Sequence, residues 1–222
     1  MSRSFSKTSV GRKVLMALSG LFLIIFLLQH LSINATSVVS AELFNEASHF
    51  MGTNPVVQFL LQPVLMFGVV FHFIMGFYLE YKNKQARPVK YFKSSASANS
   101  TWVSRNMIYS GLVILGFLAL HFADFWIPEM NYKYIEQNPA DTGRYYEELL
   151  HKFESPVRVG LYVLAFIFLS LHLMHGFQSA FQSMGVNHKK YTPIIKKLGS
   201  LYAVLVPLGF IFIALFHFIN SI

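Results

Sequence analysis

Five long apolar stretches divide this chain, and short polar connections separate them. Each stretch has close to the roughly 20 residues that an α-helix needs to cross the hydrocarbon core of a bilayer. Because backbone groups in lipid must find hydrogen-bond partners within their own segment, each stretch predicts a helix. The predicted spans are residues 14–33, 56–78, 107–127, 157–178 and 198–219. The pattern therefore predicts an all-α integral membrane bundle of five transmembrane helices, which forms a single domain over residues 1–222.

The composition supports this prediction and excludes several other classes of protein. Of the 222 residues, 54% are hydrophobic and 13% are charged, whereas about 25% of the residues of a soluble domain are charged. This balance excludes a disordered chain, a coiled coil and an ordinary soluble enzyme. The chain has no cysteine, so it cannot form disulfides, thiolate zinc sites, cysteine-ligated iron–sulfur clusters or a covalently attached c-type haem.

The basic residues indicate how the predicted bundle lies in the membrane. The N-terminal segment, the second-to-third connection and the fourth-to-fifth connection hold fourteen of the eighteen Lys and Arg residues. The first-to-second connection contains Glu42 and Glu46 but no basic residue. Because Lys and Arg favour cytoplasmic connections, we expect the N-terminus in the cytoplasm and the C-terminus outside. A net charge of +8 can indicate binding to nucleic acid. Here the placement of the basic residues for membrane orientation explains that charge, so we expect no nucleic-acid partner.

Histidines occupy the first four predicted spans, one in each, at similar distances from the start of the span. His30, His72, His121 and His172 each follow the start of their span by 14 to 16 residues, which is roughly 21–24 Å along a helix. Successive helices run in opposite directions, so we expect His30 and His121 near the outer face, and His72 and His172 near the cytoplasmic face. Ionisable residues inside a membrane are costly and are usually functional.

The sequence around these histidines repeats, so that the first two spans look like a copy of the third and fourth. A Ser-Gly pair precedes the histidine in spans one and three, and a glycine follows it by four residues in spans two and four. A flat, wide porphyrin needs closely approaching backbones, and glycine would clear that space; plain helix packing is the alternative role. These glycines are Gly20, Gly76, Gly111 and Gly176. Because the repeat includes the first span, we expect that span to be kept rather than removed as a secretory signal.

Four histidines at mirrored depths favour ligation of haem iron. A lone histidine in a membrane can instead bond to a neighbouring helix or face a water cavity, but neutral imidazole suits haem iron, and two opposed imidazoles complete its coordination. We therefore predict two b-type haems, each held non-covalently by two histidines. His175 is the alternative ligand in the fourth span, but His172 has the spacing to glycine that the second span shows. We expect the remaining histidines to be interfacial or solvated: His49, His151, His188 and His217.

Two further motifs accompany the histidines of the spans: Gln29-His30-Leu31 and Phe44-Asn45-Glu46-Ala47-Ser48-His49-Phe50-Met51. Together with His72, His121 and His172, these motifs resemble those of a known family, the bacterial di-haem cytochrome b subunit of succinate dehydrogenase and fumarate reductase. That family is also similar in length, number of spans and order of motifs. The resemblance implies that His30 and His121 ligate the distal haem and that His72 and His172 ligate the proximal haem. The chain departs from the family pattern at His175, where that pattern has Asn.

The resemblance also implies partners, a substrate and a location. The family anchors a flavoprotein subunit and an iron–sulfur subunit on the cytoplasmic face of the bacterial inner membrane, and it exchanges electrons with a quinone, usually menaquinone. It also leaves open a dimer of the whole complex. The menaquinone site is implied near the distal haem, where Asp124, Glu46, His49 and Glu42 are available as polar groups.

A further candidate concerns the haem propionates. Arg105 is expected at the cytoplasmic mouth of the third span, and a guanidinium suits paired hydrogen bonds to a carboxylate. An orientation anchor is the alternative role for this arginine. Lys13, Lys93 and Lys190 are weaker candidates for the same role.

Two other functions compete with this interpretation. One is the di-haem cytochrome b subunit of another respiratory complex, of the nitrate reductase or hydrogenase type. The other is a membrane transport or assembly protein without a cofactor. A reduced-minus-oxidised spectrum separates the last class from the two cytochrome classes, and co-purification with a flavoprotein then chooses between those two.

Overall fold

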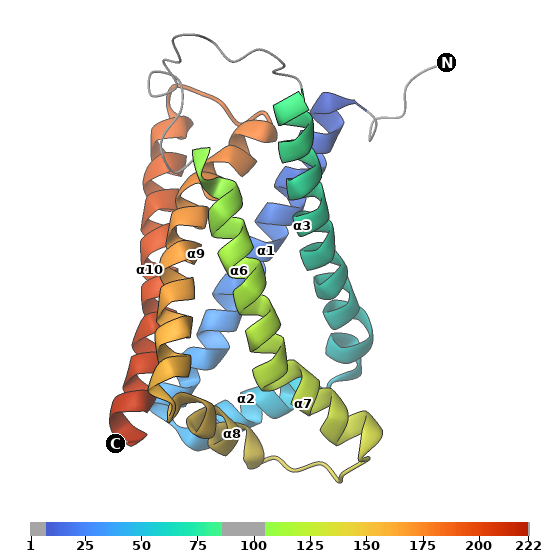
Figure 1. Ribbon diagram of the computed structural model, residues 1–222, viewed down its shortest axis with the longest axis vertical. Helices are drawn as coiled ribbons and strands as arrows, with labels where there is room; N and C mark the ends of the chain where they lie inside the picture. The colour runs from blue at the N-terminus through green and yellow to red at the C-terminus, as the bar shows by residue number, and fades with distance from the viewer. Residues whose placement is uncertain (1–7, 86–104, 222) are drawn as a thin grey trace.

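Long α-helices of alternating direction make up most of the computed structural model, which describes residues 8–85 and 105–221 (Figure 1). Five helical segments are long and apolar enough to cross a membrane: Ser9–Val39, Val57–Gln85, Met107–Ile135, Pro156–Ser183 and Tyr191–Ser221. No β-strand occurs within these described ranges. The predicted all-α bundle with five spans is therefore confirmed.

The bundle has two ends, which we name after the termini that lie nearest to them. Helices α1 (Ser9–Val39), α6 (Met107–His121) and α10 (Tyr191–Ser221) begin at the N-terminal end and run to the C-terminal end (Figure 1). Helices α3 (Gln62–Gln85) and α9 (Pro156–Ser183) run in the opposite direction.

The helices extend beyond the apolar runs that predicted them, because capping residues set their ends. The Thr8 hydroxyl accepts a hydrogen bond from the Gly11 backbone N–H at 3.0 Å and caps the start of α1. Ser155 caps α9 in the same way, through the Arg158 backbone N–H. Caps satisfy backbone groups that have no partner within the helix. An apolar run covers only the part of a helix that lies in the hydrocarbon core of the membrane, so it underestimates the length of a helix that continues beyond that core.

Turns of π-helix precede two prolines inside the second and third spans. One covers Val57–Leu61 and is followed by Pro63; the other covers Phe122–Trp126 and is followed by Pro128 in α7 (Ile127–Met130). Proline lacks the backbone N–H and its ring collides with the carbonyl four residues earlier. The wider π turn relieves that collision, and such turns are frequent at functional sites.

Two short helices lie across the C-terminal end of the bundle. Helix α2 (Ala41–Thr53) carries Glu42, Glu46 and His49, and buries Phe44. Polar side chains on one side and the buried Phe44 on the other make α2 amphipathic. Helix α8 (Arg144–Phe153) was not predicted, although its buried Leu149 and Phe153 stand four residues apart, as on one face of a helix.

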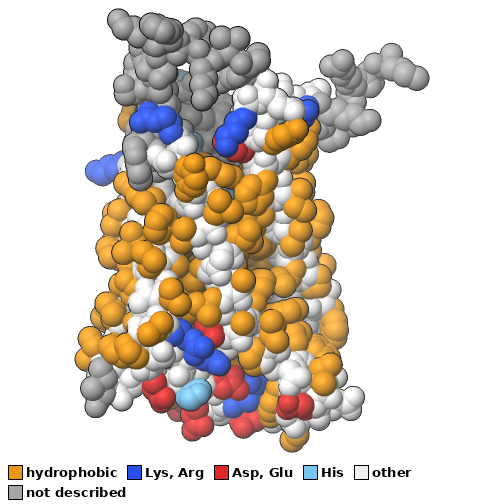
Figure 2. All heavy atoms as spheres, viewed as in Figure 1, with side chains coloured by type: hydrophobic (Ala, Val, Ile, Leu, Met, Phe, Trp, Pro, Cys, Tyr) orange, Lys and Arg blue, Asp and Glu red, His pale blue; other side chains and the backbone are white. Residues whose placement is uncertain are grey.

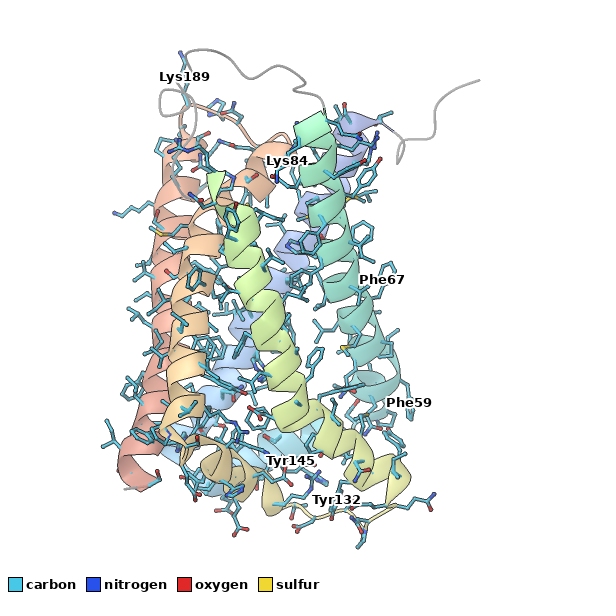
Figure 3. All side chains as sticks on the ribbon, viewed as in Figure 1. Phe59, Phe67, Lys84, Tyr132, Tyr145 and Lys189 are labelled. Atoms are coloured by element: carbon cyan, nitrogen blue, oxygen red, sulfur yellow. The ribbon has the colours of Figure 1, made fainter. Side chains whose placement is uncertain are left out.

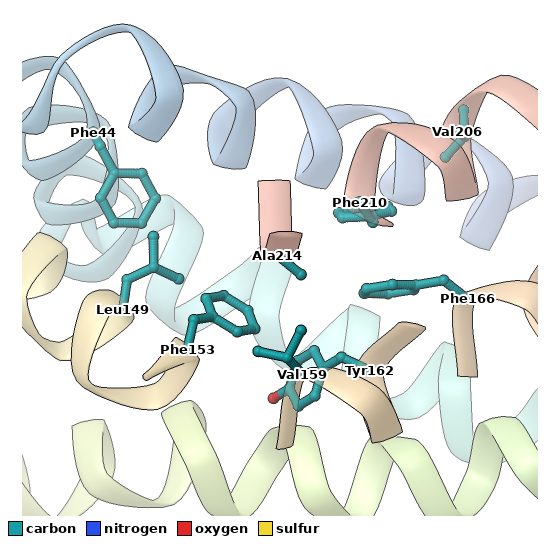
Figure 4. Close-up of a cluster of buried hydrophobic side chains, with 9 residues drawn as sticks. All are labelled: Phe44, Leu149, Phe153, Val159, Tyr162, Phe166, Val206, Phe210 and Ala214. Carbon is teal, nitrogen blue, oxygen red and sulfur yellow. The ribbon is translucent and has the colours of Figure 1, made fainter. Parts of the chain in front are cut away.

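The core lies between α9, α10 and the two short helices at the C-terminal end, α2 and α8. Tyr162 and Phe166 of α9 pack against Val206 and Phe210 of α10, and Phe44 joins them from α2 (Figure 4). The rest of the cluster is Leu149, Phe153, Val159 and Ala214. Small residues at helix interfaces allow the close backbone approach that drives association in lipid. Of the five spans, α9 and α10 have the largest buried shares.

Helix α3 is the least buried of the long helices. None of its residues is buried, although it packs along α1. Phe59 and Phe67 of the second span point away from the bundle (Figure 3). Apolar side chains exposed in this way suit contact with lipid.

Charge is distributed unequally between the two ends. Lys and Arg side chains gather at the N-terminal end, whereas acidic side chains gather at the C-terminal end together with a few basic ones, and a wide apolar band separates them (Figure 2). Lys84 and Lys189 mark the first end, and Tyr132 and Tyr145 mark the second (Figure 3). This distribution agrees with the asymmetry of the connections in the sequence.

Candidate functional site

The four histidines of the first four spans form two opposed pairs inside the bundle. The ring centroids of His30 and His121 lie 5.8 Å apart, and those of His72 and His172 lie 6.3 Å apart. Each pair therefore joins one helix of the first repeat to one helix of the second. Within α9, His172 is the histidine whose ring lies against His72.

The distance within each pair suits a metal bound between the two rings. Imidazole nitrogen binds metals at about 2.0–2.1 Å, so two opposed ligands place their ring centroids roughly 6 Å apart. The described residues contain no group of three or more His, Cys, Asp or Glu side chains that could hold an ion by themselves. Haem iron needs only two axial ligands from the protein, because the porphyrin supplies the others. The residues present therefore fit haem better than a bare metal ion.

An apolar cavity surrounds the pair at the C-terminal end. Phe26 stacks on His30, and Phe117 stacks on His121, with centroid distances of 5.5 and 5.7 Å. The cavity has a volume of about 190 Å³, whereas one water molecule needs roughly 10–15 Å³. Side chains of α3 close one side of it: Leu65, Met66 and Val69. A space of this size with apolar walls suits a large, flat and mostly apolar ligand.

Serine residues contact the pair at the N-terminal end. The Ser19 hydroxyl lies 3.1 Å from His72 Nδ1, and the Ser110 hydroxyl lies 3.2 Å from His172 Nδ1. Each serine also donates a hydrogen bond of 2.8 Å to a backbone carbonyl, that of Met16 or Met107. The two halves of the chain therefore build the same arrangement from equivalent residues.

The four glycines of the repeat lie next to this arrangement. A Cβ added at Gly20 would stand 3.6 Å from His72 Cε1, and one added at Gly111 would stand 3.7 Å from His172 Cε1. In the same way, Gly76 faces the methyl of Met16 and Gly176 faces the methyl of Met107. These are ordinary contact distances, so the protein alone would accommodate alanine at all four positions. Clearance for a haem remains a prediction for these glycines.

Asp124 lies in the π turn that follows His121, and it is bound by two side chains of α9. The Tyr162 hydroxyl donates a hydrogen bond of 2.8 Å to Asp124 Oδ2, and Arg158 Nε lies 3.3 Å from Asp124 Oδ1. The Asp124 side chain is only 4% exposed. The Tyr162 ring also lies 6.3 Å from the ring of His121. A buried carboxylate is therefore paired with a cation beside this histidine pair.

The other polar groups proposed for the outer face lie on α2. Glu42 and Glu46 are exposed, whereas His49 is half-buried and its ring lies 6.3 Å from that of Tyr145. His49 Nδ1 is buried, and no residue in the described ranges forms a hydrogen bond with it. The structure thus brings His49 toward α8 but leaves the two glutamates at the surface.

An ion-pair cluster holds α7 and α8 together beside His49. Glu129 pairs with both Lys133 and Arg144, and Arg144 also binds Glu148 at 2.5 Å. Burial alone would lower the pKa of the Arg144 guanidinium, but the hydrogen bonds and negative charges of Glu129 and Glu148 outweigh burial and raise that pKa above its ordinary value. Arg144 therefore remains charged throughout the ordinary pH range, and its ion pairs hold α8 against α7.

The basic candidates for the propionates lie at the N-terminal end. Arg105 is exposed at the start of the third span, and Lys13 and Lys190 are exposed on other helices or connections of that end. Lys93 lies outside the described residues. Their propionate role remains a prediction.

One expectation about the remaining histidines is wrong. His217 is 1% exposed rather than interfacial, because it packs between Phe153 and Tyr146 and forms a 2.8 Å hydrogen bond with Ser37. By contrast, His151 and His188 are exposed as expected. The sequence places His217 near the end of the last span, and only the packing of α8 against α10 buries it.

The sequence interpretation also missed polar partners of the candidate site. The hydroxyls of Ser19 and Ser110 were seen only as part of a repeated Ser-Gly pair, yet that repetition was a usable signal. Arg158 and Tyr162 gave no such signal, because they are distant from Asp124 in sequence and become its partners only through the packing of α9.

Two opposed histidine pairs within a membrane bundle are typical of membrane-bound b-type cytochromes. The chain is similar to the succinate dehydrogenase cytochrome b558 subunit of Bacillus subtilis (strain 168). The two sequences are 25% identical over 191 residues, which cover 86% of this chain and 83% of that protein. No family model and no solved structure matches the chain. The similarity confirms the family resemblance that the sequence motifs indicated.

Proposed function

We propose that this chain is the membrane-anchor cytochrome b subunit of a succinate:quinone oxidoreductase. The observation that carries the proposal is the pair of opposed histidine sites, His30 with His121 and His72 with His172, at the two ends of one bundle. Similarity to the Bacillus subtilis subunit supports the assignment to the succinate dehydrogenase class. The whole chain serves as a single cytochrome domain.

Each histidine pair holds one b haem in this proposal, and bound haem supplies one-electron transfer. His30 and His121 provide the axial ligands at the C-terminal end, and His72 and His172 provide them at the N-terminal end. The phenylalanines around His30 and His121 exclude water from that site. Arg105 is our candidate for binding a propionate at the N-terminal end.

Orientation and partners follow from charge and composition. The excess of Lys and Arg at the N-terminal end supports an orientation with that end in the cytoplasm of a bacterial cell and the C-terminal end on the outer side of its inner membrane. The chain has no cysteine to ligate an iron–sulfur cluster, so electrons enter from an iron–sulfur subunit that docks on the cytoplasmic side with a flavoprotein subunit. Electrons then pass between that subunit and menaquinone in the membrane.

Purification of the tagged chain from its native membranes tests the proposed function. We expect two b haems per chain by pyridine haemochrome analysis, together with a co-purified flavoprotein and an iron–sulfur protein. A strain without the gene should lose the corresponding reduced-minus-oxidised absorbance. A purified chain without haem would exclude a cytochrome, whereas haem with a different set of partners would assign the chain to another respiratory complex.

The quinone reaction is proposed at the C-terminal end, near His30 and His121. Asp124 is our first candidate for a proton acceptor, because it is buried and its hydrogen-bond partner Tyr162 contacts His121. His49 is a second candidate, with a buried nitrogen that lacks a partner among the described residues. Glu42 and Glu46 are weaker candidates, since both are exposed.

Separate assays of the two half-reactions test these quinone candidates. We expect Asp124→Asn to lower succinate–quinone activity by about 10²-fold or more, as loss of a general base does, and to leave succinate–dye activity and both haems unchanged. Glu147→Gln serves as a matched control, because Glu147 is exposed on α8 at the same end and is not a quinone candidate. Full quinone activity in Asp124→Asn, His49→Gln and Glu46→Gln would move the quinone site away from these residues.

A further inference from the structure

The two serines next to the N-terminal-end pair have their hydroxyl hydrogens already assigned. A serine hydroxyl carries a single hydrogen and two acceptor lone pairs, and a backbone carbonyl can only accept. The 2.8 Å contact between Ser19 Oγ and the Met16 carbonyl therefore uses the Ser19 hydrogen. The hydroxyl can then only accept from His72 Nδ1, 3.1 Å away, so Nδ1 carries the ring hydrogen.

Ser110 forms the same pattern of hydrogen bonds in the second half of the chain. Ser110 donates to the Met107 carbonyl at 2.8 Å and lies 3.2 Å from His172 Nδ1. Both imidazoles of this pair are thus fixed in the tautomer whose Nε2 is unprotonated and has a free lone pair. Neutral imidazole with that lone pair is the form that binds a metal.

We propose that Ser19 and Ser110 are positioning residues for the haem held by His72 and His172. Each serine fixes the tautomer and the ring orientation of its histidine and strengthens Nε2 as a donor to iron, because an accepted N–H hydrogen bond raises the basicity of the other ring nitrogen. This inference rests on the proposed function, since it requires a haem between these two histidines.

The pair at the C-terminal end lacks this support. His121 Nδ1 is buried, and no hydrogen-bond partner for it exists in the described part of the chain. Asn34 donates to the His30 carbonyl at 2.8 Å, and its side-chain nitrogen lies 3.5 Å from His30 Nε2. No serine hydroxyl within residues 8–85 and 105–221 bonds to the ring of His30 or His121. Removal of the serines should therefore affect one haem and not the other.

Serine in a helix often bonds to a backbone carbonyl without any functional role. Ser32 does so in α1, where its hydroxyl donates to the Leu28 carbonyl at 2.9 Å. Ser19 and Ser110 differ from Ser32 in being buried and in contacting a histidine nitrogen, so Ser32→Ala is a control for the loss of a helical serine without that contact.

Redox titration and electron paramagnetic resonance of the purified whole complex test the proposal. We expect Ser19→Ala, Ser110→Ala and the double variant to raise the midpoint potential of the N-terminal-end haem, because a weaker donor stabilises ferric iron less. The low-spin g values of that haem should shift as well. The other haem should keep its potential and its g values, and Ser32→Ala should match the wild type in both haems.

A second set of variants separates positioning from folding. Ser19→Thr and Ser110→Thr keep a hydroxyl and should restore the wild-type potential and g values. Loss of the N-terminal-end haem alone in the double alanine variant also supports the proposal. It is overturned if the double variant keeps both haems with unchanged potentials and g values, if both haems are lost together, or if threonine behaves like alanine. A wild-type complex without haem would overturn the proposed function instead.

Discussion

Replacement of His72 or His172 by alanine should remove the haem at the N-terminal end and leave the other haem in place. Replacement of His30 or His121 should do the reverse, because each pair lies around a separate site. A b haem has no covalent bond to the protein besides its two axial ligands, so loss of either histidine should release the haem of that site. Pyridine haemochrome analysis should therefore fall from two haems per chain to one in each single variant.

His175→Ala is the matched control for the fourth span. His175 lies three residues from His172, but the His172 ring is the one that faces His72, so this variant should keep both haems. If His175→Ala loses a haem and His172→Ala keeps both haems, then His175 rather than His172 is the ligand in the fourth span. Loss of the same haem in His30→Ala and in His72→Ala would contradict the pairing itself.

Replacement of Arg158 by methionine should destabilise the protein strongly. The change leaves the Asp124 carboxylate, 4% exposed, without the cation that pairs with it. Removal of one partner from a buried ion pair costs about 3–5 kcal/mol, and we expect the lower part of that range because Arg158 is 33% exposed. Thermal unfolding of the purified complex in detergent, followed by release of haem, measures the effect.

Two further variants show whether the uncompensated charge is the cause. Asp124→Asn combined with Arg158→Met should recover most of the lost stability, because no buried charge then lacks a partner. Tyr162→Phe removes only one hydrogen bond to that carboxylate and should cost about 1.5–3 kcal/mol. Equal stability of the single and the double variants would show that the ion pair does not hold this part of the bundle.

Hydropathy and helix geometry were sufficient to predict the long helices and the positions of the four histidines. Each span is continuous in sequence, and alternating helix direction follows from short connections, so His30 and His121 could be expected at one depth before any contact was known.

Contacts between distant segments could not be predicted in this way. Asp124 meets Arg158 only because α9 packs against the third span, and His217 meets Ser37 only because α10 packs against α1. A single sequence carries no signal for such registers. Helix α8 was missed for another reason. It is short, and among its many charged residues the two buried ones, Leu149 and Phe153, give only a weak helical pattern of apolar positions.

The repeated arrangement of serine, glycine and histidine has a consequence for how this bundle is divided. The hairpin of α1 and α3 contributes His30 and His72, and the hairpin of α6 and α9 contributes His121 and His172. Neither hairpin holds a complete pair, and each pair takes one member from each hairpin. This is the geometry of an isologous dimer, in which one surface meets a copy of itself across a two-fold axis. The connection between α3 and α6 turns what would be an association of two subunits into folding within one chain, so the assembly of both sites does not depend on protein concentration.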